Sequence, residues 1–246
     1  SEDGTVRVWD VAQGVLERTL DGHSGAVNAV ALSQDGRWAL SGSTDRTVKL
    51  WDVDNGTCLR TLKGHASSVT SVALAAQGWG ALLGSSDQTA RLWDLHNGST
   101  LATLDGHSDA VTAVSIDDSG LHAATGSVDR SVKLWHLDDL RPGPARVAHA
   151  GAVVALVFSE DGRVCASGGS DGCIVARDTE SGRILGTREQ HIAPIRSLSF
   201  TDDGACVLSS GIDGSYRLWA IEDDSNVWVP VPHTPPGADC AHRPRS

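Results

Sequence analysis

The stretch S-T-D-R-T-V-K-L-W-D, Ser43–Asp52, decides the fold of this chain because it returns at a constant interval. Clear copies are S-S-D-Q-T-A-R-L-W-D at Ser85–Asp94 and S-V-D-R-S-V-K-L-W-H at Ser127–His136. Weaker copies lie at Ser1–Asp10, Gly169–Asp178 and Gly211–Ala220. Each copy starts 42 residues after the one before it. A fixed period of this length indicates stacked structural units, each of which contacts only its neighbours.

Four kinds of residue keep this spacing without an insertion. The turn aspartates are Asp3, Asp45, Asp87, Asp129, Asp171 and Asp213. The tryptophans are Trp9, Trp51, Trp93, Trp135 and Trp219, with Arg177 in the fifth position of the series. The histidines are His23, His65, His107, His149 and His191, and the glycines are Gly36, Gly78, Gly120, Gly162 and Gly204. Because all four series stay in step, we treat the repeat as established.

Within one period, four short runs rich in β-branched and apolar residues alternate with turn signals. In the first complete unit they predict strands at 26–32, 38–43, 47–51 and 57–62. The predicted units are 1–20 (partial), 22–62, 64–104, 106–146, 148–188 and 190–228. We therefore predict an all-β fold of five complete four-stranded antiparallel sheets, plus a half sheet at the N-terminus. The Pro-rich segment 229–246 is predicted to be a disordered tail, although the last fourth strand is expected at about 226–231.

The first predicted strand of each unit carries apolar residues at recurring places. One series is Val27, Val69, Val111, Val153 and Ile195, and a second is Val30, Val72, Val114, Leu156 and Leu198. Positions 27 and 30 are an odd number of residues apart, so a regular strand would place them on opposite faces. We therefore expect both faces of each sheet to be covered by neighbouring sheets.

The composition is typical of a soluble globular chain, with 40% hydrophobic and 21% charged residues. The formal net charge of −11 disfavours a nucleic-acid partner, which requires basic patches. No apolar run approaches the roughly 20 residues of a membrane span. The five cysteines include no C-x-x-C pair, which favours reduced thiols in the cytoplasm, with the nucleus as an alternative. Asn55 and Asn97 begin Asn-Gly-Ser/Thr triplets, which we interpret as hairpin turns rather than glycosylation sites.

Each complete unit also repeats a His, a hydroxyl residue, an Asp and a Trp. The sets are His23, Ser41, Asp45 and Trp51; His65, Asp87 and Trp93; His107, Thr125, Asp129 and Trp135; His149, Ser167 and Asp171; and His191, Ser209, Asp213 and Trp219. Ser, His and Asp are also the members of a hydrolase triad. A catalytic site is a single convergence of groups, however, and five copies on five sheets favour a structural role.

A structural role also explains the residue types. A buried indole N–H needs an acceptor, and a hydroxyl can accept it and donate onward to His, which then bridges to Asp. No G-x-S-x-G elbow leads into a predicted helix, and no Walker-type loop or His/Cys cluster of metal-binding spacing is present. We therefore expect no catalytic residue, no cofactor, no metal site and no small-molecule substrate.

The Gly22-His23…Trp51-Asp52, Gly64-His65…Trp93-Asp94 and Gly106-His107…Trp135 copies resemble the WD-repeat family of β-propellers, over residues 1–228. The resemblance implies a ring of four-stranded blades in which the His–Ser/Thr–Asp–Trp set is a hydrogen-bond network. Leu83 takes the hydroxyl position in the second complete unit and Arg177 takes the Trp position in the fourth. We expect the network to be broken in both units.

The resemblance also implies a function. Family members are protein–protein interaction scaffolds that bind partner proteins or peptides, so we expect no enzymatic activity. The residues that flank each turn Asp vary within the constant frame, and we expect them to face a partner: Thr44, Arg46, Ser86, Gln88, Val128, Arg130, Ser170 and Ile212.

Two alternatives place the repeat in a larger assembly. One is the C-terminal sensing or autoinhibitory propeller of a NACHT-type or apoptosome-type NTPase. The other is a ubiquitin-ligase substrate receptor, which the absence of a Trp-Asp-x-Arg signature disfavours. The sequence contains no Met and begins within a repeat. We therefore expect it to be a piece of a longer chain whose ring has about seven blades.

Overall fold

A computed structural model describes residues 1–75, 78–143, 146–189, 191–201, 204–220 and 229–230. Within these ranges the regular secondary structure consists of β-strands alone, which confirms the predicted all-β class. The described residues contain no helix with the length and apolar character needed to cross a membrane. The segment 231–246, predicted as a disordered tail, lies outside the described residues.

The strands form a half sheet and five larger antiparallel sheets, numbered here as sheets 1 to 5. The half sheet is β1 (Val6–Asp10) and β2 (Val15–Leu20). Sheet 1 is β3 (Val27–Leu32), β4 (Trp38–Ser43), β5 (Thr47–Asp52) and β6 (Thr57–Lys63). Sheet 2 is β7 (Val69–Leu74), β8 (Gly80–Ser85), β9 (Ala90–Asp94) and β10 (Ser99–Leu104). Sheet 3 is β11 (Val111–Ile116), β12 (His122–Ser127), β13 (Ser131–His136), β14 (Arg141–Pro142) and β15 (Arg146–Val147). Sheet 4 is β16 (Val153–Phe158), β17 (Val164–Gly169), β18 (Cys173–Asp178) and β19 (Ile184–Glu189). Sheet 5 is β20 (Ile195–Phe200), β21 (Cys206–Gly211), β22 (Tyr216–Ala220) and β23 (Val229–Pro230).

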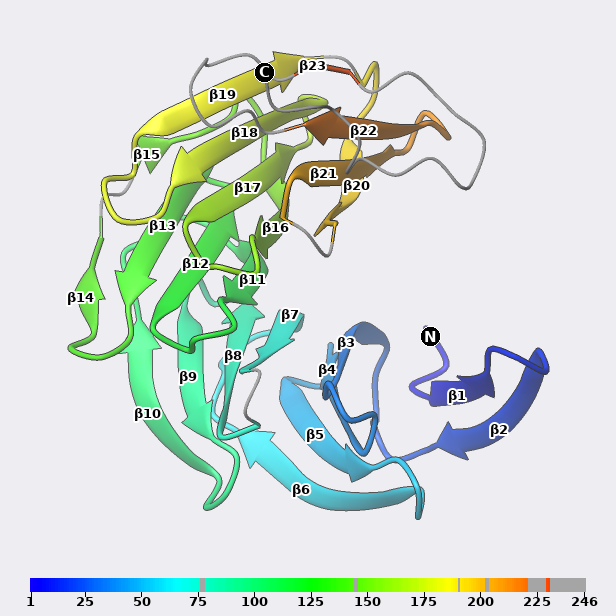
Figure 1. The fold of residues 1–246 in the computed structure, drawn as a ribbon. Coiled ribbons are helices and arrows are strands. Elements are labelled where there is room, and N and C mark those ends of the chain that lie inside the picture. Colours follow the sequence, from blue (N-terminus) through cyan, green and yellow to red (C-terminus); the bar gives the residue numbers. More distant parts are fainter. Residues whose placement is uncertain (76–77, 144–145, 190, 202–203, 221–228, 231–246) are drawn as a thin grey trace.

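Sheets 1, 2, 4 and 5 are meanders in which consecutive strands pair in chain order, and sheet 3 follows this order as far as β14. Figure 1 shows the sheets following one another around an open arc, with the first strand of each sheet toward the middle. The half sheet lies at one end of the arc and sheet 5 at the other, and the described strands do not close into a ring. The four strands predicted in sheet 1 agree with β3 to β6 within one residue at each end. Strand pairing in sheet 5 extends to β23, just past the predicted unit boundary at 228.

The outer edge of sheet 3 departs from the other sheets. Two separate two-residue strands, β14 and β15, pair with β13 at different places. Prolines occur at 142 and 144, and a proline cannot donate a ladder hydrogen bond, so a continuous outer strand is disfavoured here. The prediction of one continuous fourth strand for this unit is therefore wrong.

The sequence-based assignment of positions 27 and 30 to opposite faces is wrong. The pairing register of every first strand shifts by one residue between the two positions, which is a β-bulge. In sheet 2 the extra residue is Thr70, and the bulge turns Val69 and Val72 to the same side. A methyl group added at Gly42 of sheet 1 would lie 2.6 Å from Val69 Cγ1 and 2.9 Å from Val72 Cγ1. Both valines therefore pack on the preceding sheet.

The bulged residues also link neighbouring sheets. Asn28 Nδ2 in sheet 1 donates to the Val69 carbonyl oxygen in sheet 2 at 2.8 Å. Thr70 donates in the same way to Val111, and Thr112 to Val153, each in the next sheet. The bulged residue is polar in sheets 1, 2, 3 and 5 but is Val154 in sheet 4, so its polarity favours the link between sheets and does not by itself mark the bulge.

The core consists of apolar layers between neighbouring sheets rather than one central cluster. One layer joins Leu40 and Leu50 of sheet 1 to Val69 and Val72 of sheet 2, and similar layers follow along the arc. A smaller layer joins the half sheet to sheet 1, where Leu20 packs with Ala39 and Trp51. Each sheet is thus stabilised by the next, as expected for a repeat array.

Part of the face of sheet 1 toward the half sheet, and the face of sheet 5 at the other end of the arc, lack such a layer and are called the end faces below. Val30 of sheet 1 is 59% exposed, whereas its equivalent Val72 in sheet 2 is 9% exposed. At the other end Leu208 of sheet 5 is 42% exposed, whereas its equivalent Leu40 is fully buried. Residues that are core elsewhere in the repeat are therefore open to solvent at both ends.

Candidate functional site

The repeated polar residues meet beneath one rim of the arc, where the turn between the second and third strands of each sheet approaches the segment that precedes the first strand. In sheet 1 the Trp51 indole Nε1–H donates to Ser41 Oγ at 2.8 Å. Ser41 Oγ lies 2.7 Å from His23 Nε2, and His23 Nδ1 lies 2.8 Å from Asp45 Oδ2. The structure therefore brings all four residues into one continuous chain of hydrogen bonds.

Two further sheets hold the same four-membered chain. In sheet 3 it joins Trp135, Thr125, His107 and Asp129. In sheet 5 it joins Trp219, Ser209, His191 and Asp213.

The aspartate at the end of the chain also holds the turn. Asp45 accepts hydrogen bonds from Ser24 N at 3.0 Å, Thr47 N at 2.9 Å and Thr47 Oγ1 at 2.7 Å. Burial acts to raise the pKa of Asp45, but the bonds from the Thr47 hydroxyl and the His23 imidazole outweigh it and lower the pKa to about 2. The equivalent pKa values of Asp87 and Asp129 are also lowered to about 2. These carboxylates are therefore ionised acceptors at neutral pH.

The histidines connect the hydroxyl to the Asp carboxylate by hydrogen bonds and do not serve as acids. Burial lowers the pKa of His107 more than the neighbouring Asp129 carboxylate raises it, and the same balance holds for His65 and His149. A neutral His107 donates from Nδ1 to Asp129, so its Nε2 accepts the hydroxyl proton of Thr125. The direction of the chain is thereby defined from the indole to the carboxylate.

Sheet 2 lacks the middle of this chain because Leu83 occupies the hydroxyl position. His65 still bonds to Asp87 at 2.9 Å. Among the described residues, His65 Nε2 and Trp93 Nε1 are buried without a hydrogen-bond partner. An unpaired acceptor and an unpaired donor thus remain at the two places that a hydroxyl joins in sheets 1, 3 and 5.

Sheet 4 lacks the indole. Ser167 Oγ lies 2.9 Å from His149 Nε2, and His149 Nδ1 lies 3.2 Å from Asp171 Oδ1. Arg177, which replaces the tryptophan, is buried and donates to the carbonyls of Gly182 and Val147. Sheet 4 therefore keeps three members of the set, and its guanidinium contacts the turn at Gly182 and the outer edge of sheet 3 at Val147.

The geometry does not suit acyl-transfer chemistry. The Ser41 hydroxyl is fully buried, and its Oγ already contacts both the indole and the imidazole. A nucleophile must reach the substrate at an open position beside oxyanion donors. The described residues also contain no group of three or more His, Cys, Asp or Glu side chains that could hold a metal ion.

The residues expected to face a partner lie on the turns at this same rim. Seven of them are exposed, and Ser170 is partly buried: Thr44, Arg46, Ser86, Gln88, Val128, Arg130, Ser170 and Ile212. Arg46, Gln88 and Arg130 have left-handed backbone conformations, with φ values of 68°, 72° and 72°. Sequence reasoning did not identify this conformation, although its signal was present. The equivalent positions in the other sheets are glycines, Gly4, Gly172 and Gly214.

Comparison with known proteins agrees with this architecture. The family model described as WD domain, G-beta repeat matches five segments, at residues 14–52, 56–94, 98–136, 144–176 and 182–220. Each match begins at or near the outer strand of one sheet and ends at the third strand of the next. A single repeat therefore spans two neighbouring sheets and ties them together.

Individual relatives match only short stretches. The angio-associated migratory cell protein of Homo sapiens is 50% identical over 48 residues, which are 18% of this chain and 11% of that protein. A lissencephaly-1 homolog of Caenorhabditis briggsae is 51% identical over 37 residues, 15% of this chain and 10% of the relative. The nuclear distribution protein PAC1-2 of Uncinocarpus reesii is 49% identical over 45 residues, 18% of this chain and 10% of the relative.

These alignments extend over about one repeat each, whereas the five family matches together extend over more than half of the chain. The chain belongs to the WD domain, G-beta repeat family.

Proposed function

We propose that this protein is a non-enzymatic scaffold that binds partner proteins or peptides through the turns at the Asp-bearing rim. One observation carries the proposal. Three consecutive sheets place a long polar side chain, Arg46, Gln88 or Arg130, in a left-handed backbone position that glycine occupies elsewhere in the repeat.

This arrangement costs stability. A non-glycine residue in the left-handed region costs about 1–3 kcal/mol and is often found at functional sites. Among the described residues, the Arg46 and Arg130 side chains make no hydrogen bond or ion pair that offsets this cost. Both guanidiniums are exposed and free to form bidentate hydrogen bonds with carboxylates. We therefore infer that an acidic partner surface provides the compensating contacts.

The test is affinity capture with quantitative mass spectrometry, comparing wild type with the double variant Arg46→Gly and Arg130→Gly. Partners of this rim should be lost. The control is Arg37→Ala with Arg163→Ala, which removes the same charge from exposed turns at the opposite rim. Identical sets of captured proteins from both double variants would contradict the proposal.

We also propose that the arc forms part of a larger ring of about seven sheets. The support is the exposure of Val30 and Leu208, which are core positions in the interior sheets. The second candidate function, a sensing propeller within a larger NTPase, would also require such a ring.

Fluorescence of an apolar dye tests the ring proposal. The isolated chain should bind the dye at its end faces, and the naturally encoded polypeptide should not. Equal dye binding by both would contradict the larger ring. A nucleotide-binding loop in the naturally encoded polypeptide would favour the NTPase setting over a free-standing scaffold.

We further propose that residues 1–228 act as one propeller unit and that the protein resides in the cytoplasm or nucleus. Cys58 and Cys165 are free thiols in the structure, which supports a reducing compartment. Titration of thiols in freshly isolated protein tests the compartment, because a secreted form would be oxidised.

A further inference from the structure

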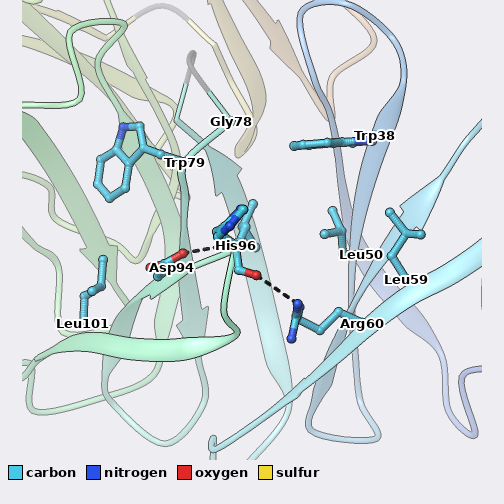
Figure 2. A pocket seen from close by; sticks show the side chains of 10 residues that line it. Trp38, Leu50, Leu59, Arg60, Gly78, Trp79, Asp94, His96 and Leu101 are labelled. Carbon is cyan, nitrogen blue, oxygen red and sulfur yellow. Dashed lines mark hydrogen bonds between the residues drawn. The ribbon is translucent and has the colours of Figure 1, made fainter.

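A cleft of about 600 Å³ lies between sheets 1 and 2, at the rim opposite the Asp-bearing turns. Its volume falls within the roughly 300–1,000 Å³ of ligand-binding sites. Figure 2 shows Trp38 and Trp79 on opposite sides of the space, with His96 between them. Leu50, Leu59, Leu95 and Leu101 complete an apolar lining.

The walls of the cleft are held in place before any ligand arrives. The Trp38 ring packs over the Gly78 turn of sheet 2, and a methyl group added at Gly78 would contact the ring at 3.4 Å. Arg60 donates to the His96 and Asn97 carbonyl oxygens at 2.9 and 3.1 Å, which fixes its guanidinium across the two sheets (Figure 2). A preorganised site loses less entropy on binding than a flexible one.

The charges around the cleft differ from those at the other turns. The position of His96 is held by Asp54, Asp138 and Glu180 in sheets 1, 3 and 4. The acidic side chain that lines the cleft is Asp94, whose oxygens already accept bonds from His96 N, Asn97 N and Asn97 Nδ2. In a chain with a net charge of −11, this cleft offers Arg60 and His96 to a ligand instead of a free carboxylate.

We propose that this cleft binds an extended segment of a partner protein that inserts a bulky apolar side chain beside an acidic residue. The apolar group packs between Trp38 and Trp79, and the carboxylate lies toward Arg60 and His96. The site is separate from the Asp-bearing rim, so the experiment below tests this proposal independently of the scaffold function proposed above.

The probe is a capped, fluorescently labelled peptide with a central phenylalanine flanked on both sides by glutamate, measured by fluorescence anisotropy. Saturable binding is expected. Replacing the flanking glutamates with lysines should weaken binding by about ten-fold, and replacing the phenylalanine with alanine by at least about ten-fold, as expected for an anchor residue.

Two protein variants localise the binding. Trp38→Val installs the residue found at the equivalent position of sheet 4 and should weaken binding by about ten-fold. His96→Asp restores the acidic residue of the neighbouring turns and should weaken binding by about three-fold. Other sheets already contain an acidic residue at this position, so His96→Asp is expected to fold. It therefore still tests the proposal if Trp38→Val is unstable.

Arg46→Gly, on the opposite rim, should leave peptide affinity unchanged. The proposal is overturned if the glutamate peptide fails to saturate at millimolar protein, or if the lysine peptide binds equally well. It is also overturned if His96→Asp binds as tightly as wild type, or if Arg46→Gly abolishes binding.

Discussion

Removing the Ser41 hydroxyl should destabilise the fold far more than the loss of one oxygen atom suggests. Ser41 is fully buried, and its Oγ is the shared partner of Trp51 Nε1 at 2.8 Å and His23 Nε2 at 2.7 Å. Ser41→Ala changes the packing little but leaves a buried donor and a buried acceptor unpaired. Each unpaired group costs about 1–3 kcal/mol, so the expected loss for the two groups is about 2–6 kcal/mol.

The chain contains its own matched control for this substitution. Ser167 in sheet 4 is equally buried and lies 2.9 Å from His149 Nε2, but an arginine replaces the indole that would donate to it. Ser167→Ala should therefore leave one ring nitrogen unpaired and cost about 1–3 kcal/mol. Ser167 Oγ also lies 3.2 Å from the Val175 carbonyl oxygen, a contact that acts to reduce the difference between the two variants, so a larger loss for Ser41→Ala reports the indole donor.

Equilibrium urea denaturation followed by far-ultraviolet circular dichroism measures both free energies of unfolding, provided that the urea dependence is the same in each variant. A Ser41→Ala variant no less stable than Ser167→Ala would refute the reasoning, because the two sites differ chiefly in the indole. An upfield shift of one indole N–H proton signal in Ser41→Ala would identify the broken bond independently.

Three further outcomes follow from the same contacts. The free energy of unfolding of Leu83→Thr should be within about 1 kcal/mol of the wild-type value, because the new hydroxyl can pair two orphaned groups while some packing is lost. Leu82→Thr, which gains no such partners, should lose about 3 kcal/mol or more. Urea denaturation of both variants checks this, and equal losses would count against it. Arg46→Gly should stabilise the fold by about 0.5–2 kcal/mol, because the relief of its left-handed backbone exceeds the greater freedom of glycine in the unfolded chain, and a lower melting temperature would contradict that account. Stability should fall in two stages on acidification, because the unfolded chain binds more protons in both windows. The first lies below pH 6.5, where unfolded histidines gain protons that the buried ones resist. The second lies between pH 3.8 and about 2, where the aspartates of the unfolded chain gain protons while the folded turn aspartates stay ionised. Urea midpoints that stay constant from about pH 7 to pH 5 would exclude the first stage.

The members of each hydrogen-bond chain could be predicted from the sequence because they recur at one spacing. The substitutions at Leu83 and Arg177 also indicated which sheets would depart from the pattern, although the replacement contacts of Arg177 could not be foreseen. Those contacts depend on carbonyls at Gly182 and Val147. Neither residue is distinguished by its sequence context from an ordinary turn or strand position.

The cleft between sheets 1 and 2 could not be predicted in the same way. Trp38 and Trp79 belong to different repeats and occupy non-equivalent positions, so the period does not pair them. Their approach results from the packing of one turn on the next, through the Gly78 contact. A signal was nevertheless present in the exchange of an acidic residue for His96.

The sequence by itself determined the repeat, most of the strands and turns of each sheet, and the members of the recurring His, hydroxyl, Asp and Trp sets. These features depend on local backbone preferences and on donors that must find acceptors, and both recur with every period. The tertiary structure decided what lies between the sheets: the bulge that turns Val69 and Val72 to one side, the cleft, and the end faces left uncovered. Those features depend on how one sheet packs against the next, and that contact joins residues about one period apart that no local pattern relates.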